Sequence, residues 1–132
     1  MTSVAADTNI WLRYLTRDDP AQAERALRWL EMAEAVFVPT TVLLELAGVL
    51  RAAYRFERAT IEAALRQIAG LPNVQLEQPD AVARALDDYS RGLDFADALH
   101  AASCPAGVTM FTLDRSFVEA GLAVGVTVAA LP

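Results

Sequence analysis

Short runs of β-branched residues alternate with longer stretches of helical periodicity, and this alternation constrains the fold more than any other feature. The β-branched runs lie at residues 3–6, 36–38, 74–76, 108–112 and 126–129. The stretches between them carry helix-start signals, such as Asp19 followed by Pro20 at the first helical position. Strands that alternate with helices are typical of parallel sheets. We therefore predict an α/β fold with a short central parallel sheet flanked by helices on both faces.

The chain has 132 residues, which fits one domain spanning residues 1–132. No internal repeat or linker divides the sequence, and its apolar fraction of 55% is that of a globular protein. The single Cys104 excludes an internal disulfide. No apolar run approaches the length of a membrane span, and no basic leader precedes the first strand. These features predict a cytoplasmic protein that does not interact with membranes.

Acidic residues outnumber basic ones, and every basic residue is arginine. Seventeen Asp and Glu residues face 11 Arg residues, which gives a net charge of −6. Nucleic acid is a polyanion, so a chain of this charge does not bind it through its overall field. Binding to RNA or DNA therefore requires a local feature that reverses the sign. The lack of lysine in the sequence also excludes any mechanism that needs one.

Two acidic residues directly follow predicted strands. Asp7 comes after the first strand and Asp114 after the fourth. Because the carboxyl ends of parallel strands meet at one edge of a sheet, both carboxylates are expected at the edge where ligands gather in α/β folds. The plainer interpretation is that each carboxylate caps the helix that follows it. The sequence leaves both roles open.

Glu45 lies in a helical stretch that is apolar nearly all round, and such a helix is expected to be buried. The residues one turn away are Thr41, Val42, Gly48 and Val49. None of them is basic. A buried carboxylate without a partner is destabilising by on the order of several kcal/mol. This favours a functional role for Glu45 and leaves open a salt bridge to a distant arginine.

Asp94 and Asp97 are three residues apart at the start of another predicted helix. A capping box normally has Glu or Gln at the position of Asp97, so a purely structural role fits poorly. Like charges on one helical face repel, and a cation beside them would remove that penalty. His100 lies one turn further along, and we assign it no chemistry. Asp88, by contrast, has arginines at helical spacing on either side, which predicts a solvated face.

Several carboxylates that meet at one sheet edge form a site for a hard cation. Mg²⁺ prefers oxygen ligands, and a substrate phosphate commonly completes its coordination. A zinc site is disfavoured because the chain has one His and one Cys. A bound divalent ion also supplies the local positive charge that the overall composition lacks.

Four motifs in this order resemble the PIN-domain nucleases, in particular the VapC-type toxins of bacterial toxin–antitoxin pairs. The motifs are Asp7-Thr8-Asn9, Glu45, the segment DFADALHAA at residues 94–102, and Thr112-Leu113-Asp114. The resemblance covers essentially the whole chain. It implies an acidic quartet of Asp7, Glu45, Asp97 and Asp114, an auxiliary acid at Asp94, and supporting polar residues at Asn9 and Thr112.

The same resemblance implies an endoribonuclease that depends on Mg²⁺ or Mn²⁺. Asp7 and Asp97 are implied as the main metal ligands, and Glu45 and Asp114 as the residues that complete the site. A water activated by the ion then attacks the phosphodiester bond. The implied partners are the RNA substrate, a cognate antitoxin protein whose C-terminal segment lies over the site, and a second copy of the chain in a homodimer.

Three arginines near the proposed sheet edge are candidates for contact with RNA phosphates. They are Arg13, Arg17 and Arg115. A guanidinium group matches the geometry of a phosphate and binds it through two hydrogen bonds. For any one of them, the alternative of facing solvent or pairing within the chain is favoured.

The rival interpretation comes from a different functional class. It is a catalytically silent, metal-binding PIN-like scaffold that acts only through protein partners. A response-regulator receiver domain also has an acidic site at its strand ends, but it needs a late lysine that this chain lacks. Metal-dependent cleavage of RNA distinguishes the nuclease from the scaffold.

Overall fold

All strands in residues 3–132, the part of the chain that the computed structural model describes, pair in parallel. This confirms the predicted α/β class. The strands form a three-stranded sheet, β1-β2-β3, and a two-stranded sheet, β4-β5. The chain divides at Gln78 and Pro79 into two compact units, and each unit contains one of the sheets. The predicted central sheet is therefore present as two hydrogen-bonded groups of parallel strands.

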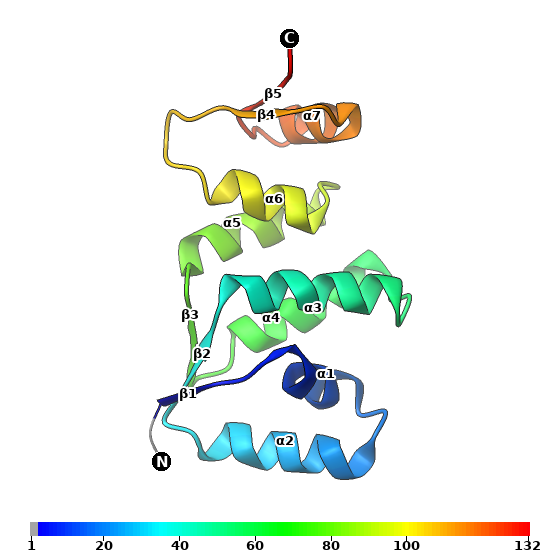
Figure 1. Cartoon of the computed structure of the whole chain (residues 1–132), viewed down its shortest axis with the longest axis vertical. Helices are drawn as coiled ribbons and strands as arrows, with labels where there is room; N and C mark the ends of the chain where they lie inside the picture. The colour runs from blue at the N-terminus through cyan, green and yellow to red at the C-terminus, as the bar shows by residue number, and fades with distance from the viewer. Residues whose placement is uncertain (1–2) are drawn as a thin grey trace. The chain divides into compact units, whose positions relative to one another are not determined.

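The first unit contains three strands and four helices (Figure 1). In chain order these are β1 (Ser3–Ala5), α1 (Thr8–Thr16), α2 (Pro20–Met32), β2 (Ala35–Val38), α3 (Thr40–Ala52), α4 (Arg58–Ala69) and β3 (Val74–Leu76). Helix α1 packs against α2 and α3, and α3 also packs against α4. Figure 1 shows α2 below β1 and α3 above it.

The register of the first sheet brings the carboxyl ends of its strands to one edge. Val36 of β2 pairs with Val4 of β1 on one side and with Val74 of β3 on the other. Asp7 follows the carboxyl end of β1, as predicted. The large side chains that form the core of this unit include Trp11, Leu43, Leu46, Leu50, Ile61, Leu65 and Ile68. Trp11 lies one turn after Asp7, so its burial holds the start of α1 against the rest of the unit.

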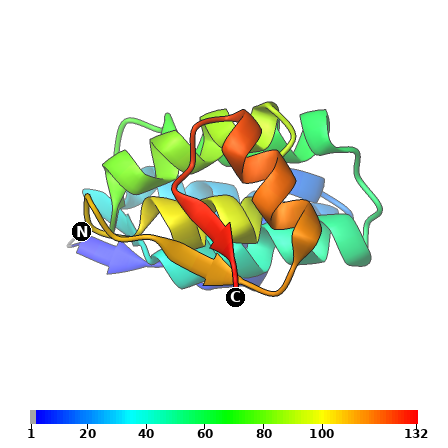
Figure 2. The same ribbon diagram turned by 90° about the horizontal axis from the view of Figure 1, so that it is seen from above.

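The second unit contains three helices and two strands. These are α5 (Pro79–Ser90), α6 (Phe95–Ala102), β4 (Met110–Thr112), α7 (Arg115–Ala123) and β5 (Val128–Ala130). Figure 2 shows β4 and β5 in this unit, with α7 connecting them. Helices α5 and α6 pack closely, and Tyr89 of α5 meets Phe95 of α6 edge-on with ring centroids 5.8 Å apart. Both rings are buried, so this pair forms part of the core.

Neither of the two threonines at the start of α3 caps this helix. Thr40 and Thr41 are both helical residues, and Pro39 occupies the cap position without a side-chain hydrogen bond. Glu77, directly after β3, accepts a hydrogen bond from the backbone N–H of Thr40 at 2.9 Å. A carboxylate at this end of a helix is favourable because it meets free N–H groups and the positive end of the helix dipole. Local sequence rules do not predict this contact, because Glu77 is 37 residues from Thr40 in the sequence.

The last two strands begin two residues later than predicted, at Met110 and Val128. Before β5, Gly125 has a φ of +84° and the N–H of Val126 donates to the carbonyl of Gly121 at 2.8 Å. A turn therefore uses β-branched residues that the sequence pattern assigns to a strand. No helix within residues 3–132 is both long enough and apolar enough to cross a membrane.

Candidate active site

Asp7 has the capping role that the sequence leaves open. It is the N-cap of α1, and its Oδ1 accepts a hydrogen bond from the backbone N–H of Ile10 at 3.3 Å. The side chain is exposed, and no donor among residues 3–132 contacts its Oδ2. One carboxylate oxygen therefore holds the helix terminus while the other remains available. A capping role and a ligand role are compatible at this position.

Glu45 is exposed, so the predicted burial of its helix on all sides is wrong. Helix α3 buries one face, formed by Leu43, Leu46, Ala47 and Leu50. Glu45 lies outside this face, among half-buried apolar residues. Its Oε1 accepts a hydrogen bond from the hydroxyl group of Thr8, the first residue of α1. The partner that the sequence did not reveal is thus a threonine beside Asp7, and not an arginine.

The polar residues after Asp7 lie along a groove on the first unit. Asn9 of α1 lines this groove, which has a volume of about 850 Å³, together with Arg13, Arg25 and Trp29. Arg17 ends α1 in a left-handed conformation, with a φ of 53°, and its side chain is exposed. Asn9 and Arg17 therefore both lie on the surface near the two ends of α1.

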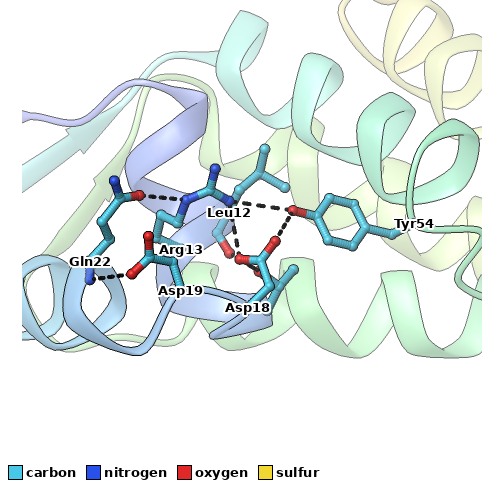
Figure 3. A network of polar contacts seen from close by, with 7 residues as sticks. Leu12, Arg13, Asp18, Asp19, Gln22 and Tyr54 are labelled. Carbon is cyan, nitrogen blue, oxygen red and sulfur yellow. Dashed lines mark hydrogen bonds and ion pairs between the residues drawn. The ribbon is translucent and has the colours of Figure 1, made fainter.

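Arg13 pairs within the chain, which is the alternative that the sequence favours, in a network of polar contacts whose partners the sequence does not identify (Figure 3). Its guanidinium donates to Gln22 Oε1 at 2.8 Å, to Asp18 Oδ1 at 3.1 Å and to the hydroxyl oxygen of Tyr54 at 3.4 Å. The Tyr54 hydroxyl in turn donates to Asp18 Oδ2 at 2.9 Å. These contacts join the loop after α1 to α2 and to the residues after α3. A contact between Arg13 and RNA would have to compete with them.

Hydrogen bonds dominate the electrostatics of this network. The Tyr54 hydroxyl, followed by that of Thr16, lowers the pKa of Asp18 because both donate to the ionised carboxylate. The Tyr54 hydroxyl and the charge of Asp18 raise the pKa of Arg13 above its usual value. No short-range sequence motif signals this arrangement, because Tyr54 is 36 residues from Asp18.

In the second unit, Asp94 and Asp114 also cap helices. Asp94 is the N-cap of α6, and its Oδ2 accepts from the backbone N–H of Asp97 at 3.3 Å. Asp114 is the N-cap of α7, and its Oδ1 accepts from the N–H and the hydroxyl group of Ser116 at 2.9 and 2.6 Å. Thr112 Oγ1 accepts from the N–H of Asp114 at 3.0 Å. Thr112 therefore holds the backbone that carries Asp114.

Asp97 is an acid of the second unit whose surroundings disfavour the charged form. Burial raises its pKa, and the negative charges of Asp94 and Asp114 raise it further, against a smaller opposing effect of His100. Asp114 differs, because the hydrogen bonds from Ser116 and from the N–H of Phe117 lower its pKa. The second unit thus brings Asp94, Asp97 and Asp114 within electrostatic reach of one another. Arg115, next to Asp114, is exposed.

The predicted site residues are divided between the two units. Asp7, Asn9 and Glu45 belong to the first unit, while Asp94, Asp97, Thr112 and Asp114 belong to the second. Within residues 3–132, no three His, Cys, Asp or Glu side chains are grouped closely enough to hold one metal ion. The donor chemistry still fits Mg²⁺ or Mn²⁺, because all the candidate donors are oxygens. A cation would also relieve the repulsion that raises the pKa of Asp97.

Comparison with known proteins identifies the family. The family model of the PIN domain matches residues 4–122. The chain belongs to the PIN domain family. The crystal structure of VapC20 from Mycobacterium tuberculosis, described as a toxin that cleaves the sarcin–ricin loop, is similar to this PIN domain, with 24% sequence identity and a TM-score of 0.44 over 92% of this chain and 95% of that chain. A search of curated proteins found no match.

The PIN match extends over both units and includes every predicted site residue from Asp7 to Arg115. PIN-domain proteins are typically nucleases, and PIN nucleases generally use divalent metal ions. Membership of this family therefore supports a hydrolase that cleaves nucleic acid. It also agrees with an oxygen-only set of candidate donors.

Proposed function

We propose that this PIN domain is a metal-dependent endoribonuclease and the toxin component of a toxin–antitoxin module. The observation that carries the proposal is the environment of Asp97. In a chain that matches the PIN family over residues 4–122, burial raises the pKa of this carboxylate, and the charges of Asp94 and Asp114 raise it further. Such an arrangement is costly without a cation and favourable with one. The two units form one PIN domain in this proposal.

In the proposed mechanism, four carboxylates would hold the divalent ion that acts on the substrate phosphate. Asp7 and Asp97 would be the main ligands of Mg²⁺ or Mn²⁺, and Glu45 and Asp114 would complete the site directly or through water. When bound, the ion lowers the pKa of a water molecule and offsets the charge of the phosphate oxygens. The chain's own contribution is to fix the carboxylates before substrate binds.

Neighbouring residues of the chain provide this orientation. Thr8 donates to Glu45, Asp94 receives the N–H of Asp97, and Thr112 receives the N–H of Asp114. Asn9 supports the same site in the proposal. Arg17 and Arg115 are the exposed candidates for contact with RNA phosphates, and Arg13 is a candidate only if it leaves its network. The proposed place of action is the cytoplasm, where its RNA substrate lies.

The partners of the protein are part of the same proposal. They are the RNA substrate, a cognate antitoxin that covers the acidic site with its C-terminal segment, and a second copy of the chain in a homodimer. These assignments follow from the resemblance of the sequence motifs to VapC-type toxins.

Cleavage of end-labelled total RNA tests the proposal. Purified protein is assayed with Mg²⁺, with Mn²⁺ and with EDTA, beside Asp7→Asn and Asp19→Asn prepared in the same way. Asp19 caps α2 as Asp7 caps α1, so Asp19→Asn controls for the loss of a capping charge. We expect discrete fragments from the parent and from Asp19→Asn with metal, and a loss of at least about 100-fold in Asp7→Asn or with EDTA.

Two outcomes would contradict this expectation. Equal cleavage by the parent and by Asp7→Asn would show that a contaminating nuclease is responsible. Metal binding without any cleavage would favour the silent scaffold.

A further inference from the structure

Thr8 makes a contact that its place in the sequence does not explain. It is the first residue of α1, next to Asp7, and its hydroxyl group donates to Glu45 Oε1 in the middle of α3. Thr8 is 7% exposed, whereas Glu45 is exposed. A buried donor thus holds one oxygen of an exposed carboxylate. The contact lies entirely within the first unit, so it does not depend on the second.

The ordinary role of a helical threonine is visible elsewhere on the same helix. The Thr16 hydroxyl shares its one proton between the carbonyl of Leu12, four residues earlier, at 2.7 Å and Asp18 Oδ1 at 2.9 Å, so both of its contacts are local. Thr8 is the first residue of α1, separated from the end of β1 by two residues, and has no helical turn before it. Its hydroxyl group therefore points out of α1 and reaches across to α3.

Stability alone gives little reason for this hydrogen bond. Helices α1 and α3 already pack together, and each contributes buried apolar side chains, such as Trp11, Leu46 and Leu50, to the core. An exposed carboxylate without Thr8 would be hydrated, so the bond to Thr8 replaces bonds to water. What the contact does change is the freedom of Glu45, whose long side chain would otherwise sample many rotamers at the surface.

We propose that Thr8 is a positioning residue that holds the Glu45 carboxylate in one orientation beside Asp7. Asp7 and Thr8 are consecutive, so α1 fixes a free oxygen of the first acid and the hydrogen-bond donor for the second. Glu45 Oε1 is engaged by Thr8, which leaves Oε2 for a cation or a bound water. This inference rests on the proposed function, because it assigns Thr8 to the same metal-dependent site.

The test compares Thr8→Val, which removes the hydroxyl group at nearly constant shape, with Thr8→Ser, which keeps it. Thr16→Val is the matched control, because it removes a hydroxyl group from the same helix away from Glu45. We expect Thr8→Val to weaken Mn²⁺ binding, measured by calorimetry, by about 10-fold and to slow RNA cleavage by about 10- to 100-fold. Thr8→Ser and Thr16→Val should stay within about twofold of the parent. In a Glu45→Gln background, Thr8→Val should have no further effect.

A second measurement is independent of metal and of cleavage. NMR relaxation of the Glu45 side-chain methylenes, in the metal-free protein, should show greater mobility in Thr8→Val than in the parent or in Thr8→Ser. Unchanged mobility and unchanged Mn²⁺ affinity in folded Thr8→Val would overturn the role of Thr8, as would a loss in Thr8→Ser equal to that in Thr8→Val. If the parent neither binds Mn²⁺ nor cleaves RNA, the proposed function fails, whereas the mobility comparison still shows whether Thr8 orders Glu45.

Discussion

The two units of this PIN domain treat their carboxylates differently. In the first unit, hydrogen-bond donors of the chain contact the carboxylates of Glu45 and Asp18. Thr8 donates to Glu45, and Tyr54, Thr16 and Arg13 converge on Asp18. The hydrogen bonds from Tyr54 and Thr16 stabilise the ionised carboxylate of Asp18 and lower its pKa.

In the second unit, burial and repulsion between like charges have more influence on the pKa values of the carboxylates. Asp97 is partly buried beside Asp94 and Asp114, and burial also raises the pKa of Asp88, against the opposing charges of Arg91 and Arg84. Asp88 is 7% exposed, so the predicted solvated face is wrong at this residue. Only Asp114 of this group has a pKa lowered by hydrogen bonds.

We expect the carboxylates of the two units to have different roles in the proposed function. The first unit presents carboxylates that are already oriented by donors of the chain. The second unit presents Asp97, whose pKa is raised by burial and by the charges of Asp94 and Asp114. A divalent ion bound near Asp97 should therefore lower the pKa of this residue.

The largest expected effect is stabilisation by a divalent ion. At a concentration ten times the Kd of the ion, Mg²⁺ or Mn²⁺ should raise the free energy of unfolding by about 1.4 kcal/mol, because the ion binds the folded state alone. Thermal unfolding with and without ion measures this. Asp97→Asn should lose the response while remaining at least as stable as the parent without metal. A melting temperature indifferent to millimolar ion would contradict a shared acidic site.

Replacing the buried acid of α5 should have the next largest effect. The raised pKa of Asp88 means that the folded state binds its proton more tightly than the unfolded state. Stability from this residue is therefore present below the pKa of the unfolded chain and is lost as the pH rises through the folded pKa. Asp88→Asn should be more stable than the parent by about 1 kcal/mol at pH 7, and the gain should vanish in acid.

Denaturant unfolding across this pH range measures the difference. Glu119→Gln removes an exposed carboxylate from α7 of the same unit and serves as the control. If Glu119→Gln stabilises the protein as much as Asp88→Asn, the effect comes from net charge and not from burial.

The smallest effect, with the opposite sign, is expected in the first unit. Tyr54→Phe removes the donor that contributes most to the lowered pKa of Asp18, and should lower the melting temperature by about 2–4 °C at neutral pH. Stability from a lowered carboxylate pKa is present above the pKa of the unfolded chain and is lost as the pH falls. The deficit of Tyr54→Phe should therefore narrow in acid.

Tyr14→Phe is the matched control for this change. The Tyr14 hydroxyl accepts one exposed hydrogen bond from Gln67, at 3.1 Å, and touches no carboxylate. Its removal should lower the melting temperature less and without the pH dependence. If the stability of the two variants has the same pH dependence, the Tyr54 hydroxyl does not lower the pKa of Asp18.

Much of the fold could be predicted because it depends on local chemistry. The alternation of strand and helix patterns predicted the α/β class. Asp7, Asp19, Asp94 and Asp114, which the sequence places at helix starts, each accept a backbone N–H there. Capping is governed by residues within one turn, so a single sequence contains the information. The order of motifs likewise indicated the PIN family, which the family match confirms.

The sequence by itself determined which residue types are available and where helices begin, because these follow from spacing within a few residues. Only the tertiary structure decided how each carboxylate is surrounded. The partner of Glu45 is 37 residues away, Tyr54 is 36 residues from Asp18, and Asp88 is buried despite the arginines on its own helix. The physical reason is that pKa and hydrogen bonding depend on distances in space, and packing between elements sets these distances.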